Sequence, residues 1–147
     1  MANSLSAAIK ATVSELEMIK QDLIISYQVT LYEIGKLLVF HTPIDTGRAS
    51  SNWNVSSGER TEQERDPPDS SVKGELSMEA ISYQVKDLHE HPEALFYNPV
   101  DYIDILDGGY KGDGIGSPQA PAGITTPTAT QVGKIWIKNL KQNGLIK

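Results

Sequence analysis

The first 41 residues carry a pattern of apolar side chains that predicts one long helix. Large apolar residues recur at steps of three or four, with a mean step of about 3.7, which is helical and not strand spacing. They are Leu5, Ile9, Val13, Leu16, Ile19, Leu23, Tyr27, Leu31, Ile34 and Leu38. Asn3 or Ser4 can cap the start of the helix. Pro43 ends it, because the residue before a proline avoids the α region. The sequence therefore predicts a helix over residues 4–41.

A helix of this length does not fit inside one small domain. At about 1.5 Å per residue it would span about 55 Å, whereas 147 residues form a single ordinary domain with one core. Ile24, Ile25, Val39 and Phe40 widen the apolar stripe toward the C-terminal half. We therefore expect that half to be buried and the far end to pack on something outside the domain. Gly35 is the expected place for a kink.

The rest of the chain divides into short elements and loops. In chain order we expect a turn at 42–48, a strand at 49–56, a flexible acidic arm or loop at 57–74, a helix from about 77 to 89 with a strand at 82–85 as the alternative, a short buried strand at 94–98, helical turns at 100–107, a Gly/Pro-rich loop at 108–123 and a C-terminal helix at 127–143. Val132, Ile135, Trp136 and Leu140 give the last helix an apolar stripe, which the polar Asn139 interrupts. The predicted fold class is α+β, in a single domain of residues 1–147: a long N-terminal helix, a small antiparallel β-sheet and a C-terminal helix.

Composition and motifs exclude several classes of function. The chain has no cysteine, which excludes disulfides, thiolate catalysis, zinc fingers and iron–sulfur clusters. The chain has no unbroken stretch of about 18 apolar residues, so the sequence predicts no transmembrane helix. No secretion signal is visible. Phosphate-binding loops, a nucleophile elbow and EF-hand spacing are absent. Asp87, His89 and His91 could hold a metal on a strand, but a polar loop is the simpler interpretation. We expect no enzyme, no metal and no cofactor.

Charge is unevenly divided along this chain of net charge −6. Residues 59–113, the acidic waist, carry fourteen acids and five bases, whereas residues 114–147, the basic tail, carry four lysines and no acid. This distribution argues against nucleic-acid binding over the whole surface, which needs a broad Lys/Arg footprint. It permits self-association, in which the acidic waist of one copy meets the basic tail of another. A chance segregation of charge along the chain is an equal alternative.

Three short segments form a recognisable set after the long helix. They are Thr42-Pro43-Ile44-Asp45-Thr46-Gly47-Arg48-Ala49 followed by Asn52-Trp53, then Tyr97-Asn98-Pro99-Val100-Asp101-Tyr102-Ile103 with Leu106, Asp107 and Gly109, and finally Gln119-Ala120-Pro121-Ala122-Gly123. In this order they resemble the neck and tail-completion proteins of tailed bacteriophages, of the lambdoid tail-component type. The resemblance covers residues 5–140 in outline. Asp107 stands where that family usually has glutamate, and Asp101 departs from a proline-tyrosine pattern.

The resemblance implies a structural virion protein at the head–tail neck. Such a protein completes or terminates the tail and joins it to the head, as one subunit of a homo-oligomeric ring expected to have six members. Its partners would be neighbouring neck and tail-tube proteins, with DNA passing through the ring, no specific nucleic-acid binding and no membrane. Assembly would occur in the host cytoplasm. The alternatives are a virion-associated enzyme such as a cell-wall hydrolase, and a cytoplasmic adaptor with no virion role.

Ten residues are candidates for shaping the fold or an interface. We expect Asp45, Gly47 and Arg48 to shape the turn after the helix, and Arg48 and Asp107 to form an ion pair inside or between subunits. Trp53 and Trp136 are anchors for core packing or for an interface. If the acidic waist faces a neighbouring subunit, the lysines of the basic tail are its expected partners. If the waist instead faces the channel of the ring, we expect it to repel DNA. The full set is Asp45, Gly47, Arg48, Trp53, Tyr102, Asp107, Pro121, Lys134, Trp136 and Lys138.

Overall fold

A computed structural model describes residues 2–69 and 74–147 of the chain. Its elements are α1 (Ala2–His41), β1 (Asn54–Ser56), α2 (Glu75–Gln84), the 3₁₀ turn η1 (Leu88–Glu90), β2 (Leu95–Tyr97), α3 (Ile103–Asp107) and α4 (Thr125–Gln142). The predicted α+β class is confirmed, with a long N-terminal helix, a two-stranded antiparallel sheet and a C-terminal helix. The end of the expected arm, residues 70–73, lies outside the described residues.

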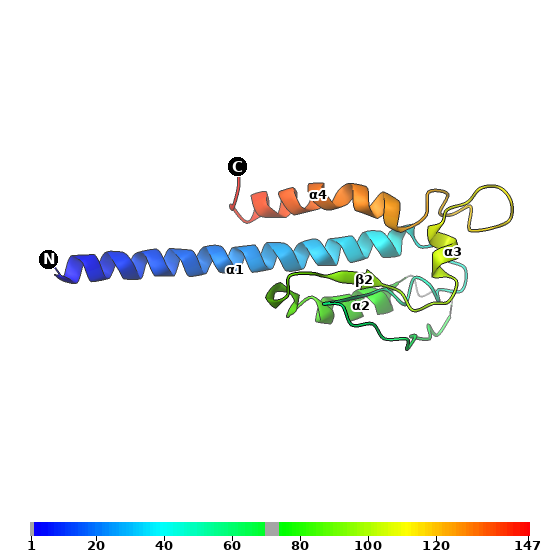
Figure 1. The fold of residues 1–147 in the computed structure, drawn as a ribbon, viewed down its shortest axis with the longest axis horizontal. Coiled ribbons are helices and arrows are strands. Elements are labelled where there is room, and N and C mark those ends of the chain that lie inside the picture. Colours follow the sequence, from blue (N-terminus) through cyan, green and yellow to red (C-terminus); the bar gives the residue numbers. More distant parts are fainter. Residues whose placement is uncertain (1, 70–73) are drawn as a thin grey trace.

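The C-terminal half of α1 is the centre of the fold. In Figure 1, α4 lies along one side of this half, and α2 and β2 lie along the other. The main cluster of buried apolar residues joins α1 to the layers around it; its members are Leu31, Ile34, Leu38, Val39, Trp53, Val55, Ile81, Val85, Leu88 and Ile124. The prediction that this half of α1 is the more buried one is confirmed, although Ile25 and Phe40, two of the residues that led to it, are 45% and 79% exposed.

The N-terminal half of α1 extends well beyond the rest of the molecule (Figure 1). Every residue from 3 to 21 is exposed, and Leu23 is still 46% exposed. We call residues 3–23 the projecting segment. At about 1.5 Å per residue it is about 30 Å long, and it carries much of the apolar stripe seen in the sequence.

By length and composition, α1 could also span a membrane, because one 18-residue window in it reaches a mean hydropathy of 1.4. Its most apolar stretch, residues 23–40, carries only Glu33 and Lys36 as charged residues. That stretch includes Leu31, Ile34 and Leu38, which are buried in the core. Core packing therefore explains part of this hydropathy.

The strand expected at 49–56 is mostly a turn. The amide of Ser51 donates to the carbonyl of Gly47 (3.0 Å), and that of Asn52 donates to the carbonyl of Ala49 (3.2 Å). Because these hydrogen bonds hold the segment in a turn, β1 begins only at Asn54. It pairs with β2 from Asn54 opposite Tyr97 to Ser56 opposite Leu95. The prediction for this segment was wrong in length, although the antiparallel pairing with the strand near residue 96 gives the small sheet that was expected.

Other boundaries shift by a few residues. The helix expected to run to residue 89 ends at Gln84, and η1 follows as a separate turn. The strand alternative at 82–85 is therefore wrong. The short strand, the helical turns and the Gly/Pro-rich loop occupy the expected regions, and α4 begins two residues before its expected start.

Gly35 serves close packing and not a kink. α1 is one uninterrupted helix from Ala2 to His41, and Figure 1 shows no sharp bend along it. A Cβ added at Gly35 would lie 2.8 Å from Cδ1 and 3.3 Å from Cγ2 of Ile81, which is fully buried. The missing side chain therefore allows α2 to approach α1.

Substituting the two helix-interior glycines tests this reading of Gly35. A Cβ at Gly133 in α4 meets nothing within 4 Å, so Gly133→Ala should raise the free energy of unfolding by up to about 1 kcal/mol through helix propensity. Gly35→Ala gains the same propensity but overpacks Ile81, at a cost of about 1–3 kcal/mol. We expect a net loss of about 1 kcal/mol by urea unfolding. Equal stabilisation by both variants would contradict close packing at Gly35.

Candidate assembly interface

The segment after α1 folds around a set of buried hydrogen bonds. The indole Nε1 of Trp53 donates to Oγ1 of Thr42 (2.8 Å), at the end of α1. The backbone amide of Trp53 donates to Oγ of Ser77 (2.8 Å), and this hydroxyl donates to the carbonyl of Ser50 (2.7 Å). Trp53 is 3% exposed. In this chain it therefore packs in the core, where it joins α1 to α2.

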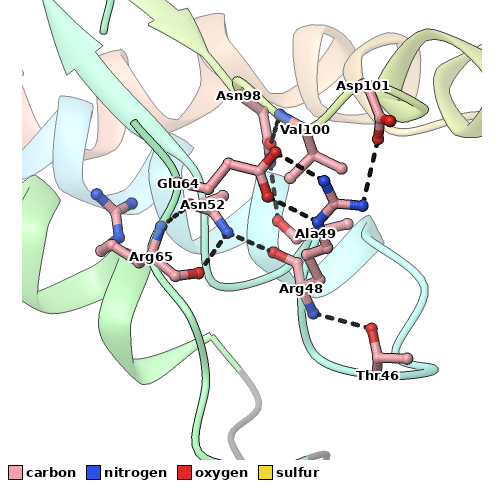
Figure 2. Close-up of polar contacts among 9 residues, drawn as sticks. All are labelled: Thr46, Arg48, Ala49, Asn52, Glu64, Arg65, Asn98, Val100 and Asp101. Carbon is pink, nitrogen blue, oxygen red and sulfur yellow. Dashed lines mark hydrogen bonds and ion pairs between the residues drawn. The ribbon is translucent and has the colours of Figure 1, made fainter. Parts of the chain in front are cut away.

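Asn52 connects this turn to the segment expected to be a flexible arm (Figure 2). Its amide Nδ2 donates to the carbonyls of Arg48 (2.8 Å) and Arg65 (2.9 Å). Its Oδ1 accepts from the backbone amide of Arg65 (2.6 Å). Asn52 itself is fully buried. Residues 57–69 form no helix or strand, but they are held to the body at this point.

The Arg65 side chain is held by neutral oxygens. Its guanidinium donates to the carbonyls of Ser51 (2.8 Å) and Trp53 (2.6 Å) and to Oδ1 of Asn54 (2.8 Å). Within residues 2–69 and 74–147, no carboxylate pairs with it. Burial lowers the pKa of Arg65 from its ordinary value. The hydrogen bonds to its three acceptors compensate for the partial removal of this cation from water.

Arg48 is the second anchor of this segment (Figure 2). Its Nε and one terminal nitrogen form a two-bond contact with the Glu64 carboxylate, at 2.6 and 2.8 Å. The other terminal nitrogen lies 3.3 Å from Asp101. The guanidinium carbon lies 5.3 Å from the centre of the Tyr102 ring, within cation–π range. Arg48 therefore joins the turn, the 57–69 segment and the start of α3.

Asp107 caps α4 and does not bind Arg48, so the ion pair expected between Arg48 and Asp107 is not formed within the chain. Oδ1 of Asp107 accepts from the amides of Ile124 (2.9 Å) and Thr125 (2.7 Å), and Oδ2 accepts from the Thr125 hydroxyl (2.7 Å). The free amides at a helix start are good partners for a carboxylate. Burial raises the pKa of Asp107, but these bonds outweigh it, so the net pKa is lowered.

The three motif segments contact one another at one end of the molecule. The Asn98 side chain donates to the carbonyl of Ala49 (2.8 Å), which joins the first to the second. The amide of Ile44 donates to Oε1 of Gln119 (3.1 Å), which joins the first to the third. The amide of Tyr110, next to the second segment, donates to the carbonyl of Pro121 (3.2 Å). We call this contiguous set the motif cluster.

Two glycines make this close contact possible. Gly123 has φ +78°, and a Cβ there would lie 2.1 Å from the carbonyl oxygen of Asp107. Gly109 has φ +79°, and a Cβ there would lie 2.8 Å from the carbonyl oxygen of Pro121. Only glycine adopts such φ values at little cost and leaves space for the neighbouring backbone. The second and third segments therefore pack backbone against backbone.

The ten candidate residues fall into two groups. Asp45, Gly47, Arg48 and Tyr102 line one hollow of about 300 Å³ in the motif cluster. Asp45 is exposed there, and the side-chain bond within its turn comes from Oγ1 of Thr46, which accepts from the amide of Arg48 (3.3 Å). Trp53, Asp107 and Pro121 belong to the same end of the molecule. Gly47 has φ +81°, as the turn requires.

Lys134, Trp136 and Lys138 form the second group, on α4. Lys134 is exposed, whereas Lys138 pairs with Glu33 of α1 at 2.5 Å. Trp136 is half-buried and lines a groove of about 290 Å³. The other residues lining that groove are Leu23, Ile24, Tyr27, His89, His91 and Pro92. We call it the η1 groove. The described residues contain no group of three or more side chains suited to hold a metal ion.

Asn139 is the contact residue that the sequence analysis missed. It was read as an interruption of the apolar stripe, yet it is only 1% exposed. Its Nδ2 donates to Oγ1 of Thr30 (3.0 Å) and to the Glu33 carboxylate (2.8 Å). Glu33 also binds Lys138, and although burial raises the pKa of Glu33, these partners outweigh it and lower the net pKa. Polar contacts therefore hold much of α4 on α1.

Removing the Asp107 carboxylate should weaken the start of α4. Because the pKa of Asp107 is lowered on folding, its contribution is present above the unfolded value near pH 4 and is lost as pH falls through the folded value. Asp107→Ala should cost about 1–2 kcal/mol at pH 7, measured by urea unfolding between pH 2 and 7. Asp107→Asn keeps an acceptor and should recover part of this loss, without its pH dependence. Asp104→Ala, at an exposed α3 position, is the control.

Breaking the Glu64 contact should release the 57–69 segment locally. We expect Glu64→Gln to accelerate amide hydrogen exchange over residues 61–66, because the two-bond contact with Arg48 loses its charge. Glu62→Gln, two residues away and exposed, removes the same charge without that contact. Equal exchange in both variants would show that Glu64 does not restrain the segment.

The same chain was compared with known protein families, with curated proteins and with solved structures. None of the three comparisons found a match. Function is therefore inferred from the residues of the motif cluster and from the exposed surfaces of α1 and α4.

Proposed function

We propose that this protein is a structural subunit of a tailed-phage virion, located at the head–tail neck. It forms a ring that completes or terminates the tail and joins it to the head. The motif cluster carries the proposal. The three segments that resemble the family are far apart in sequence, but the contacts of Asn98 with Ala49 and of Ile44 with Gln119 bring them together. If the three segments serve one common role, we expect them to lie at one site.

The distribution of surfaces suits a subunit of an assembly. Each subunit in a closed ring uses two different surfaces, one for each neighbour. This chain offers the motif cluster at one end of the molecule and a groove between α1 and α4 along its side. Exposed apolar residues are also found beside α4, where Phe40 is 79% exposed at the edge of this groove of about 630 Å³. Large exposed apolar side chains of this kind favour protein partners.

The charges available to a neighbour are fewer than the sequence count indicates. Glu64 and Asp107 of the acidic waist are used inside the chain, by Arg48 and by the start of α4. In the basic tail, Lys138 is used by Glu33. Lys134 and Lys141 remain exposed on α4. These two lysines are the ones that would meet an acidic neighbour, if the waist of the next subunit faces them.

Reversing these two lysines tests the electrostatic part of the proposal. Lys134→Glu combined with Lys141→Glu should impair ring assembly, most strongly at low salt, where the new repulsion is least screened. Lys138 is left intact so that α4 stays paired with Glu33. The Lys134→Gln, Lys141→Gln variant loses attraction without adding repulsion and should be intermediate. Light scattering and electron microscopy measure assembly. Unimpaired assembly of the reversed variant at low salt would show that the charge segregation is incidental.

The role itself is tested in particles. Mass spectrometry of purified virions should detect the chain at a few copies per particle, and electron microscopy should place it at the neck. A cytoplasmic adaptor would be absent from the particles. A cell-wall hydrolase would be present but would also clear a zymogram. Protein that stays monomeric at high concentration and is missing from virions would overturn the proposal.

A further inference from the structure

The projecting segment has one strongly apolar face that no other part of the described chain covers. Leu5, Ile9, Leu16 and Ile19 are each between 51% and 65% exposed, and Leu23 at the base is 46% exposed. At 3.6 residues per turn these side chains lie along one side of the helix. Most helix stability in proteins comes from packing an apolar face, and a large exposed apolar face marks an interaction site. The face therefore favours a partner.

The amount of surface agrees with one missing interface. The chain has 9406 Å² of accessible surface. A compact monomer of 16.1 kDa would have about 7,400 Å². The excess of about 2,000 Å² in one chain is larger than the about 800 Å² that each partner buries in a standard protein–protein interface, so the surface is large enough for such a contact. A second copy of the segment would supply a matching helix.

The direction of such a partner is limited by the body of the molecule. One turn beyond Leu23, the apolar face continues at Tyr27, which lines the η1 groove together with Trp136 of α4 and His89. A second helix running parallel would meet α4 and η1 as it passed Tyr27. A helix running antiparallel would instead end at the η1 groove, and its own body would lie beyond the N-terminus of the first helix.

The spacing of the apolar residues is self-complementary in the antiparallel direction. With Leu5 opposite Leu23 of the second copy, Ile9 lies opposite Ile19, and Thr12 lies opposite Leu16. Each layer then matches residues from both ends of the same segment, as the two-fold symmetry of an isologous contact demands.

We propose that two copies of this chain pair through antiparallel packing of their projecting segments, with the start of each α1 at the η1 groove of the other copy. This pairing goes beyond the neck role and does not depend on it. A dimer would support it whether or not the chain is found in virions.

Leu16 and Met18 provide a matched pair of variants. Leu16 lies in the centre of the apolar face, and Met18, 65% exposed, lies on the opposite side of the same helix. We expect a dimer in analytical ultracentrifugation. Because each copy of Leu16 is buried in the dimer, Leu16→Glu should raise its dissociation constant at least about tenfold, and Met18→Glu should change it far less. Thermal unfolding of the body should be the same in both variants, since residues 3–21 are exposed.

Introduced cysteines report the direction, because the chain has none of its own. Leu5→Cys mixed with Leu23→Cys should form a disulfide-linked heterodimer under mild oxidation, and Leu5→Cys alone should not crosslink. Crosslinking of Leu5→Cys with itself would show parallel helices and overturn the proposal.

Glu15 gives a second, independent measure of direction. It lies at one edge of the apolar face and Lys20 lies at the other. In antiparallel helices Glu15 faces its own counterpart, whereas in parallel helices it faces Lys20 of the second copy. Glu15→Gln should therefore tighten the dimer, and a weaker dimer would overturn the proposal. A chain that remains monomeric also overturns it, including one that sediments with phosphatidylcholine vesicles, since a membrane would then cover the face.

Discussion

The hydrogen bonds of Asn52 and Trp53 determine how the chain after α1 folds back onto that helix. The indole of Trp53 is fixed by Thr42 at the end of α1, its amide by Ser77 of α2, and the Asn52 side chain by the backbones of Arg48 and Arg65. These groups are buried, and leaving a buried polar group without a partner costs about 1–3 kcal/mol. The turn, the 57–69 segment and α2 are therefore placed together. The sheet and the motif cluster depend on this placement.

Periodicity predicted the parts of the fold whose stability comes from burying one face of a regular element. The α1 and α4 helices were predicted because their apolar spacing extends over many residues, and the Gly/Pro-rich loop because few other structures tolerate that composition. The strand expected at 49–56 was too long, since Asn52 and its neighbours bury polar groups in a turn. No periodic signal exists for such a network, which depends on Ser77 and Arg65 from distant parts of the chain.

The candidate site was predicted less completely, and for a related reason. Opposite charge led to the expected Arg48–Asp107 pair, but the backbone amides at the start of α4 occupy Asp107, and Glu64 occupies Arg48. A helix start acts as a partial positive charge that a count of charged side chains overlooks. Asn139 was missed because it was read only as a polar interruption of the apolar stripe. The three motif segments lie together in the fold, through the contacts of Asn98 with Ala49 and of Ile44 with Gln119.

The attachment of α4 gives the molecule unequal local stability. Several of its contacts with α1 run through Asn139, Lys138 and Thr30, and Oδ1 of Asn139 is buried without a hydrogen-bond partner among the described residues. Hydrogen bonds of this kind are exchanged for bonds to water at little net free energy. Water offers no comparable replacement for the apolar contacts between α1 and α2. α4 is therefore attached to α1 partly through groups that water can replace when the helix opens locally, which lowers the free energy of that opening.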